Sequence, residues 1–74
     1  MLIKRSDGSR LILTAREVKM LQMMADGKTG RMMSVELGIA YQHTKNLKIV
    51  LYAKLEAVSA PHAVAIGFRK GVIE

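Results

Sequence analysis

Residues 41–56 combine an apolar repeat with basic and polar side chains that could reach another molecule. The leucines of this segment recur every four positions, at Leu47, Leu51 and Leu55. This spacing predicts a helix that buries one side. Since steps of three and four return to the same side of a helix, the side opposite the leucines is expected to carry Lys45, Lys48 and Tyr52.

The first turns of this predicted helix hold groups that suit the base edges of duplex DNA. Lys45 could donate to O6 or N7 of guanine, and Asn46 could pair with N6 and N7 of adenine. Ile49, on the next turn, could touch the methyl group of thymine. A good contact of this kind discriminates between bases by roughly 1–3 kcal/mol. These three residues are therefore the predicted base contacts.

Phosphate contacts are expected around a second predicted helix, which begins near Thr29. Lys28, Thr29 and Arg31 cluster there, and the free amides and dipole of a helix N-terminus favour an anion. Polar side chains of the 41–56 helix could add contacts at the groove wall. The predicted phosphate contacts are Lys28, Thr29, Arg31, His43, Lys48, Tyr52 and Lys54.

No arrangement of residues predicts catalysis, a metal site or a cofactor. The carboxylates are scattered, at Asp7, Glu17, Asp26, Glu36, Glu56 and Glu74. There is no Cys, and His43 and His62 lie far apart with no further ligand at metal-binding spacing. The glycines form no phosphate-binding loop after a strand. We therefore expect a protein that is not an enzyme and needs neither metal nor cofactor.

The length and charge of the chain limit the number of domains and the kind of partner. Seventy-four residues suffice for one domain. With 12 Lys and Arg against 6 Asp and Glu, the net charge of +6 favours a polyanionic partner. No apolar stretch is long enough to cross a bilayer, and the N-terminus lacks the apolar core of a signal peptide. We expect a cytoplasmic protein without a membrane partner.

Residues 1–13 are predicted to form a β-hairpin. Asp7-Gly8 lies between two aliphatic runs, which is typical of a two-residue type I′ turn. The cross-strand pairs would then be Arg5 with Arg10 and Ile3 with Ile12. The alternative is a frayed basic arm.

Residues 14–74 are expected to form four helices. The predicted N-caps are Thr14, in a capping box with Glu17, then Thr29 and Ser59. The predicted stops are Asp26-Gly27, Gly38 and Gly71. Val72 and Ile73 could then fold back onto the core. The expected fold class is all-α, with four helices behind the hairpin.

Gly38 lies between two of these helices, where the turn of a helix-turn-helix needs a residue that accepts positive φ. Ser34, four positions earlier, is small enough for the next helix to cross. The apolar residues expected to fix the crossing are Met33, Leu37, Ile39 and Leu47. Thr44 is the polar exception, and its hydroxyl needs a partner such as the carbonyl of Ala40. A row of lysines on a helix is usually only a solvated face. The lysines of the 41–56 helix follow the helix-turn-helix glycine, and this position favours contact with DNA.

A set of residues and short motifs runs in one register from Leu13 to Ile73: Leu13-Thr14, Arg16-Glu17, Leu21, Ala25, Gly27, Leu37-Gly38-Ile39, Lys45, Tyr52, Lys54-Leu55, Ala63-Val64 and Gly71-Val72-Ile73. In these positions the chain resembles the LuxR-type, or GerE-like, helix-turn-helix proteins of bacteria. The resemblance implies a four-helix domain whose third helix enters the DNA major groove and whose fourth helix commonly pairs two subunits. The chain departs from the family pattern at Ala40, His43, Thr44, Leu47 and Ile49.

We therefore expect a transcriptional regulator of the bacterial nucleoid that binds specific double-stranded DNA as a homodimer. The expected dimer interface on the last helix is Val64, Ala65 and Phe68. The alternative is a stand-alone module that binds and modulates a LuxR-type regulator or RNA polymerase. Its contact surface would be the hairpin or exposed methionines, for which the candidates are Met20, Met23 and Met32. Nonspecific nucleic-acid binding is a third, weaker alternative.

Overall fold

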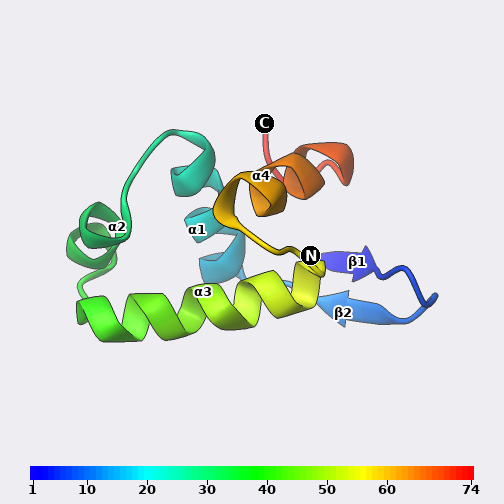
Figure 1. The fold of residues 1–74 in the computed structure, drawn as a ribbon, viewed down its shortest axis with the longest axis horizontal. Coiled ribbons are helices and arrows are strands. Elements are labelled where there is room, and N and C mark those ends of the chain that lie inside the picture. Colours follow the sequence, from blue (N-terminus) through cyan, green and yellow to red (C-terminus); the bar gives the residue numbers. More distant parts are fainter.

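A computed structural model describes residues 1–74 and contains a two-stranded antiparallel sheet followed by four helices (Figure 1). The strands are β1 (Leu2–Lys4) and β2 (Arg10–Ile12), and the helices are α1 (Ala15–Ala25), α2 (Gly30–Leu37), α3 (Tyr41–Leu55) and α4 (Ala60–Arg69). The molecule measures 35 × 21 × 20 Å. α2 packs on the start of α3, while the hairpin lies near its other end. The predicted fold class is confirmed.

The helices begin at the predicted caps. In the capping box, the Glu17 amide donates to Thr14 Oγ1 (3.1 Å), and the Thr14 amide donates to the Glu17 carboxylate (2.8 Å). Thr29 accepts from the amide of Met32, and Ser59 caps α4 in the same way. Ala40 provides no side-chain cap for α3.

The hairpin forms, but the predicted register is wrong by one residue. The pairs are Leu2 with Ile12, Ile3 with Leu11, and Lys4 with Arg10. The loop has three residues, because the Arg5 amide donates to the Ser9 carbonyl (2.8 Å) and the Gly8 amide donates to the Arg5 carbonyl (3.0 Å). Gly8 has a φ of 88°, as a type I turn followed by a left-handed residue requires.

Asp7 explains why the longer loop is favoured. Its Oδ1 accepts from both the amide (2.9 Å) and the hydroxyl (2.6 Å) of Ser9, so the side chain itself stabilises the turn. The shift of one residue decides which side chains are buried. Ile3 becomes part of the core at 4% exposure, whereas Ile12 is 65% exposed.

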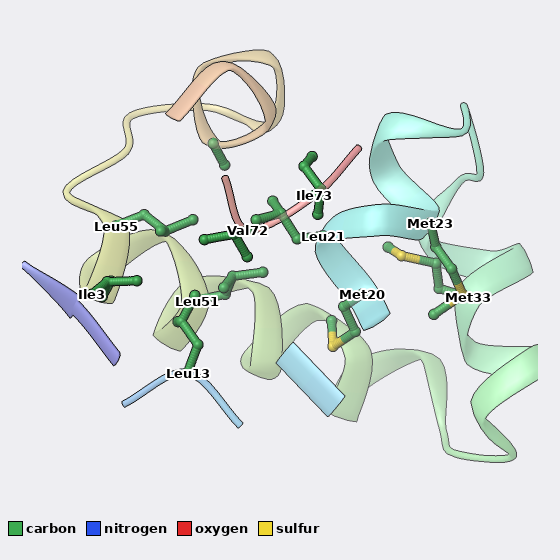
Figure 2. Packing of buried hydrophobic residues seen from close by; sticks show 11 residues of the cluster. Ile3, Leu13, Met20, Leu21, Met23, Met33, Leu51, Leu55, Val72 and Ile73 are labelled. Atoms are coloured by element: carbon green, nitrogen blue, oxygen red, sulfur yellow. The ribbon is translucent and has the colours of Figure 1, made fainter. Parts of the chain in front are cut away.

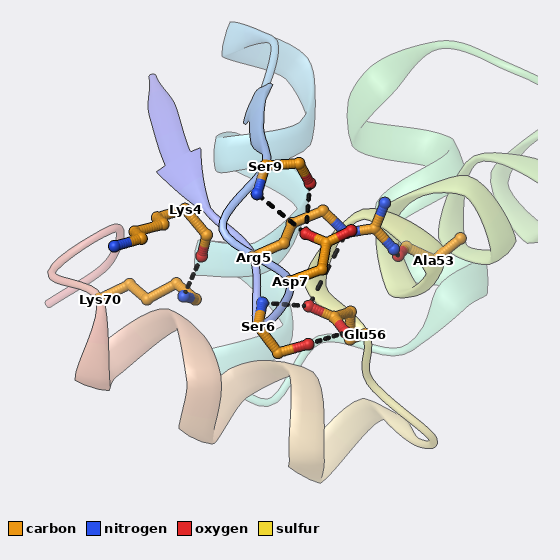
Figure 3. Close-up of polar contacts among 8 residues, drawn as sticks. All are labelled: Lys4, Arg5, Ser6, Asp7, Ser9, Ala53, Glu56 and Lys70. Atoms are coloured by element: carbon orange, nitrogen blue, oxygen red, sulfur yellow. Dashed lines mark hydrogen bonds and ion pairs between the residues drawn. The ribbon is translucent and has the colours of Figure 1, made fainter.

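The tip of the hairpin is fixed to the C-terminal end of α3 (Figure 3). The carboxylate of Glu56 accepts from the amide (2.9 Å) and the hydroxyl (2.6 Å) of Ser6. Glu56 has a φ of 57°, which is costly for a residue with a Cβ. Its bonds to Ser6 help to offset that cost, so one residue ends α3 and holds the hairpin.

The core runs from Ile3 on the hairpin to Met33 on α2 (Figure 2). Met20 is fully buried and Met23 is 4% exposed, so both belong to the core. The idea that these two methionines form an exposed contact surface is therefore wrong. Met32 is exposed. Met fills irregular gaps well, which suits a core with few aromatic residues.

The C-terminal segment closes this core. After Gly71, whose φ is 70°, Val72 and Ile73 are buried as predicted. α3 and α4 meet at a bend of 48°. Neither helix is long and apolar enough to cross a bilayer by itself. The bent pair taken together has the length and composition of a broken membrane span, on those two criteria alone.

Gly67 allows α4 to approach α1 closely. A Cβ at this position would lie 2.7 Å from Cδ2 of Leu21 and 3.2 Å from two side-chain atoms of Ile73. Leu21 is fully buried and Ile73 nearly so, and neither can move without disturbing other core residues. The absence of a side chain at Gly67 is therefore a packing requirement.

We expect Gly67→Ala to lower the free energy of unfolding by up to about 2 kcal/mol, because overpacking costs roughly 1–3 kcal/mol and the gain in helix propensity offsets only about 1 kcal/mol of it. Chemical denaturation followed by circular dichroism measures this. A stabilised variant, as helix propensity alone predicts, would contradict the close approach of α4 to α1.

Candidate nucleic-acid interface

The turn between α2 and α3 has the predicted helix-turn-helix geometry. Gly38 has a φ of 67°, and its amide donates to the carbonyl of Val35 (3.2 Å). The next amide, that of Ile39, donates to the carbonyl of Ser34 (3.0 Å), which closes the end of α2. Ser34 is buried, and its hydroxyl donates to the carbonyl of Arg31 (2.7 Å).

Thr44 faces the interior at the position where α3 meets the rest of the domain. Its side chain is fully buried, and its hydroxyl donates to the carbonyl of Ala40 at 3.4 Å, as expected from the sequence. This long bond gives the hydroxyl a partner inside an otherwise apolar contact. It orients the first turn of α3, which lacks a capping side chain.

The three predicted base contacts are exposed on α3. Lys45 and Asn46 lie in its first turns, and Ile49 is 66% exposed on the next. The side-chain amide of Gln42 donates to Oδ1 of Asn46 (3.2 Å). Gln42 was missed in the sequence analysis, although its spacing of four from Asn46 places the two amides on one face.

Tyr41 joins the first turns of α2 and α3. The guanidinium of Arg31 lies 4.4 Å from the centre of its ring, and the ammonium of Lys45 lies 5.6 Å from it. Both distances allow cation–π attraction. The ring thus gathers a predicted phosphate contact and a predicted base contact at one place.

Gly30 lets the start of α2 approach α3. A Cβ on Gly30 would lie 3.1 Å from Cε1 of Tyr41 and 3.2 Å from Nζ of Lys48. The lysine ammonium therefore lies close to the N-terminal end of α2, where free amides and the helix dipole favour an anion. We call Arg31, Tyr41, Lys45 and Lys48 the corner cluster.

The expectation that Lys48 and Tyr52 lie opposite the leucines is wrong. Both are half-buried and line a hollow of about 380 Å³ between the four helices. Lys48 is four residues after Thr44 and three before Leu51, both fully buried, so the buried side of α3 is broader than the leucine row. Burial raises the pKa of Tyr52, which keeps its hydroxyl neutral.

Two of the predicted phosphate contacts already have carboxylate partners. Lys28 donates to both oxygens of Glu36 (2.9 Å each), an exposed pair that solvent screens. Lys54 donates to Oε1 of Glu17 (2.8 Å) and to the carbonyl of Ile12 (3.0 Å). Its ammonium is therefore used to join α3, α1 and the hairpin.

Glu17 is the most buried carboxylate of the chain, at 6% exposure. Burial raises the pKa of Glu17, but bonds from Lys54 and the Thr14 amide and the charge of Lys54 outweigh it, leaving the pKa below its ordinary value. Glu36 also has a lowered pKa, mainly because Lys28 donates to it, with burial opposing.

The remaining predicted site residues differ in accessibility. Thr29 and His43 are both exposed, and each lies two residues along the chain from a member of the corner cluster. On α4, Phe68 is 50% exposed, while Val64 and Ala65 are half-buried and Val64 packs against the core. Phe68 is thus the residue of the predicted dimer interface that offers most free apolar surface.

In a comparison with family models, residues 11–66 match the GerE model, described as "Bacterial regulatory proteins, luxR family". Comparisons with curated proteins and with solved structures gave no match. The matched range contains α1, α2 and α3 and most of α4. Domains of this family are DNA-binding regulators rather than enzymes. With three quarters of its length covered and the helix-turn-helix geometry in place, the chain belongs to the LuxR family of bacterial regulatory proteins.

Proposed function

We propose that this protein regulates transcription by placing α3 in the DNA major groove and reading sequence with Lys45, Asn46 and Ile49. The observation that carries the proposal is the corner cluster. Arg31 and Lys45 both lie on the ring of Tyr41, at 4.4 Å and 5.6 Å. A protein surface that joins groove-reading and phosphate-binding groups at the helix-turn-helix corner suits duplex DNA.

The base contacts are supported by exposure and chemistry. Lys45 makes no hydrogen bond to the protein, so its ammonium is free to donate to guanine. Asn46 now shares its oxygen with Gln42, and we propose that the pair acts together on adenine. Ile49 supplies an exposed apolar group for a thymine methyl.

Phosphate binding is assigned to the start of α2 and its neighbours. Arg31, Thr29 and the first amides of α2 would hold one phosphate, with Lys48 close by at Gly30. His43 is exposed and would flank the groove. Lys28 contributes if it exchanges Glu36 for a phosphate, which an exposed pair permits at low cost. We assign no phosphate contact to Lys54, which donates to Glu17, or to Tyr52, which packs against the core.

We propose further that two copies pair through α4. Phe68 exposes half of its side chain and would be the apolar centre of this contact, flanked by Val64 and Ala65. A two-fold dimer would read an inverted repeat with half-sites about 34–36 Å apart. The net charge of +6 would attract such a dimer to the bacterial nucleoid in the cytoplasm.

Selection of bound duplexes from a random DNA library tests this function. We expect enrichment of one motif, arranged as an inverted repeat at about one helical turn. Enrichment of a single half-site would contradict dimerisation but would still support sequence-specific DNA binding. A flat profile in the presence of binding would contradict sequence-specific recognition.

A further inference from the structure

A groove lies between the hairpin and the C-terminal end of α4. Figure 1 shows these two elements at the end of the molecule away from α2. Its volume is about 690 Å³. Four cationic side chains line it, two on each wall: Lys4 and Arg5 from the hairpin, and Arg69 and Lys70 from the end of α4. We call it the basic groove. Leu55 and Ile66 add the apolar part of its lining.

Bonds between elements hold the walls of the basic groove in place (Figure 3). Lys70 donates from Nζ to the carbonyl of Lys4 (2.7 Å), which ties the end of α4 to β1. The bonds from Ser6 to Glu56 tie the hairpin tip to α3. Because both walls are fixed, a ligand would not need to order them.

Two of the four cations of the basic groove, Lys4 and Arg69, have no counterion. Arg5 has its Nε buried without a hydrogen-bond partner, 3.7 Å from the Glu56 carboxylate, and its Nη2 reaches the carbonyl of Ala53 only at 3.4 Å. Arg69 and the ammonium of Lys4 form no ion pair. Glu56 is the one carboxylate of the lining, and its oxygens already accept from Ser6. The guanidinium of Arg69 and the ammonium of Lys4 are therefore the donors that the groove offers to an incoming anion.

We propose that the basic groove binds an acidic segment of a partner protein. Carboxylates of Asp or Glu would pair with the guanidinium of Arg69, whose fork suits a carboxylate, and with the ammonium of Lys4. An apolar side chain of the same segment would cover Ile66, which is half-buried. Charge complementarity selects an acidic partner, and the partly exposed Ile66 favours a peptide over a phosphodiester backbone.

The location keeps this contact separate from the DNA surface. Leu55 lies ten residues after Lys45, about 15 Å along α3 at 1.5 Å per residue. A regulator could thus hold DNA at the corner cluster and a protein at the basic groove. Most of the hairpin lies outside residues 11–66, the range that matches the family model. The hairpin would then supply the surface through which this chain binds a protein partner.

Titration with a defined peptide tests the proposal. The probe is a fluorescent peptide of three Asp-Glu-Leu repeats, and its control carries Asn and Gln in place of the acids. We expect binding of the acidic peptide alone, with amide chemical-shift changes confined to the hairpin, Leu55 and the end of α4. The double variant Lys4→Gln, Arg69→Gln should weaken this binding by about tenfold.

The matched control is Arg16→Gln, Lys19→Gln, which removes the same charge from exposed positions of α1 outside the groove. It should bind the peptide nearly as well as the natural chain, and both double variants should bind duplex DNA equally. Absence of binding at millimolar peptide, or equal loss in both double variants, overturns the proposal. A larger loss of DNA binding in the groove variant also overturns it, since the groove would then hold nucleic-acid phosphates.

Discussion

Lys45→Ala is expected to weaken binding to the selected DNA motif by about 5- to 150-fold, the equivalent of the roughly 1–3 kcal/mol that a good base contact contributes. The side chain is exposed and makes no hydrogen bond within the protein, and its ammonium lies 5.6 Å from the centre of the Tyr41 ring. Its removal should therefore leave the free energy of unfolding nearly unchanged.

Gel-shift titrations at several salt concentrations would measure this effect. If Lys45 reads a base, the loss should be large on the selected motif and small on scrambled duplexes. Lys19→Ala is a suitable control, because it removes the same charge from an exposed position on α1. An equal loss with Lys19→Ala, or a loss that is uniform across sequences, would contradict base reading by Lys45 and leave it as a general phosphate contact.

Local signals in the sequence predicted the helices well. Thr14, Thr29 and Ser59 all cap the helices they were expected to cap, and Gly38 adopts the left-handed conformation of the turn. These features depend on a few neighbouring residues, and their chemistry is therefore visible in the sequence. The register of the hairpin was not predicted correctly. The two hydrogen bonds that Asp7 accepts from Ser9 favour a longer loop than Asp-Gly alone suggests.

The candidate site was predicted less completely, for a tertiary reason. The spacing of leucines in α3 does not reveal that the buried side extends as far as Lys48 and Tyr52, each about 100° around the helix from the leucine before it. Nor does it reveal that Tyr41 gathers Arg31 from another helix. Such contacts depend on how α2 crosses α3, which local periodicity does not specify.

Glu17→Gln is expected to lower the free energy of unfolding at neutral pH by about 2 kcal/mol. The buried carboxylate accepts from Lys54 (2.8 Å) and from the Thr14 amide (2.8 Å), so it joins α1, α3 and, through Lys54, the hairpin. Gln can still cap the helix but leaves Lys54 without a countercharge. Removing one partner of a fully buried pair costs roughly 3–5 kcal/mol, and we expect less because the Lys54 side chain is 26% exposed.

The pH dependence distinguishes a lost charge from a lost contact. Since the folded pKa of Glu17 lies below its ordinary value of 4.5, the carboxylate stabilises the fold fully above that value. This contribution disappears as the pH falls through the lower, folded pKa, where the natural side chain becomes neutral like Gln. The free energies of unfolding of the natural chain and Glu17→Gln should therefore converge below pH 4.5.

Denaturation at a series of pH values, with Glu36→Gln as the comparison, would measure this. Glu36 also pairs with a lysine and also has a lowered pKa, but both partners are exposed, so its replacement should change stability much less. If Glu17→Gln lowers the free energy of unfolding by the same amount at neutral and at acidic pH, the shape of the Glu17 side chain, rather than its charge, stabilises the fold. In that case the joining of α1, α3 and the hairpin by Lys54 would have to rest on its bond to the Ile12 carbonyl.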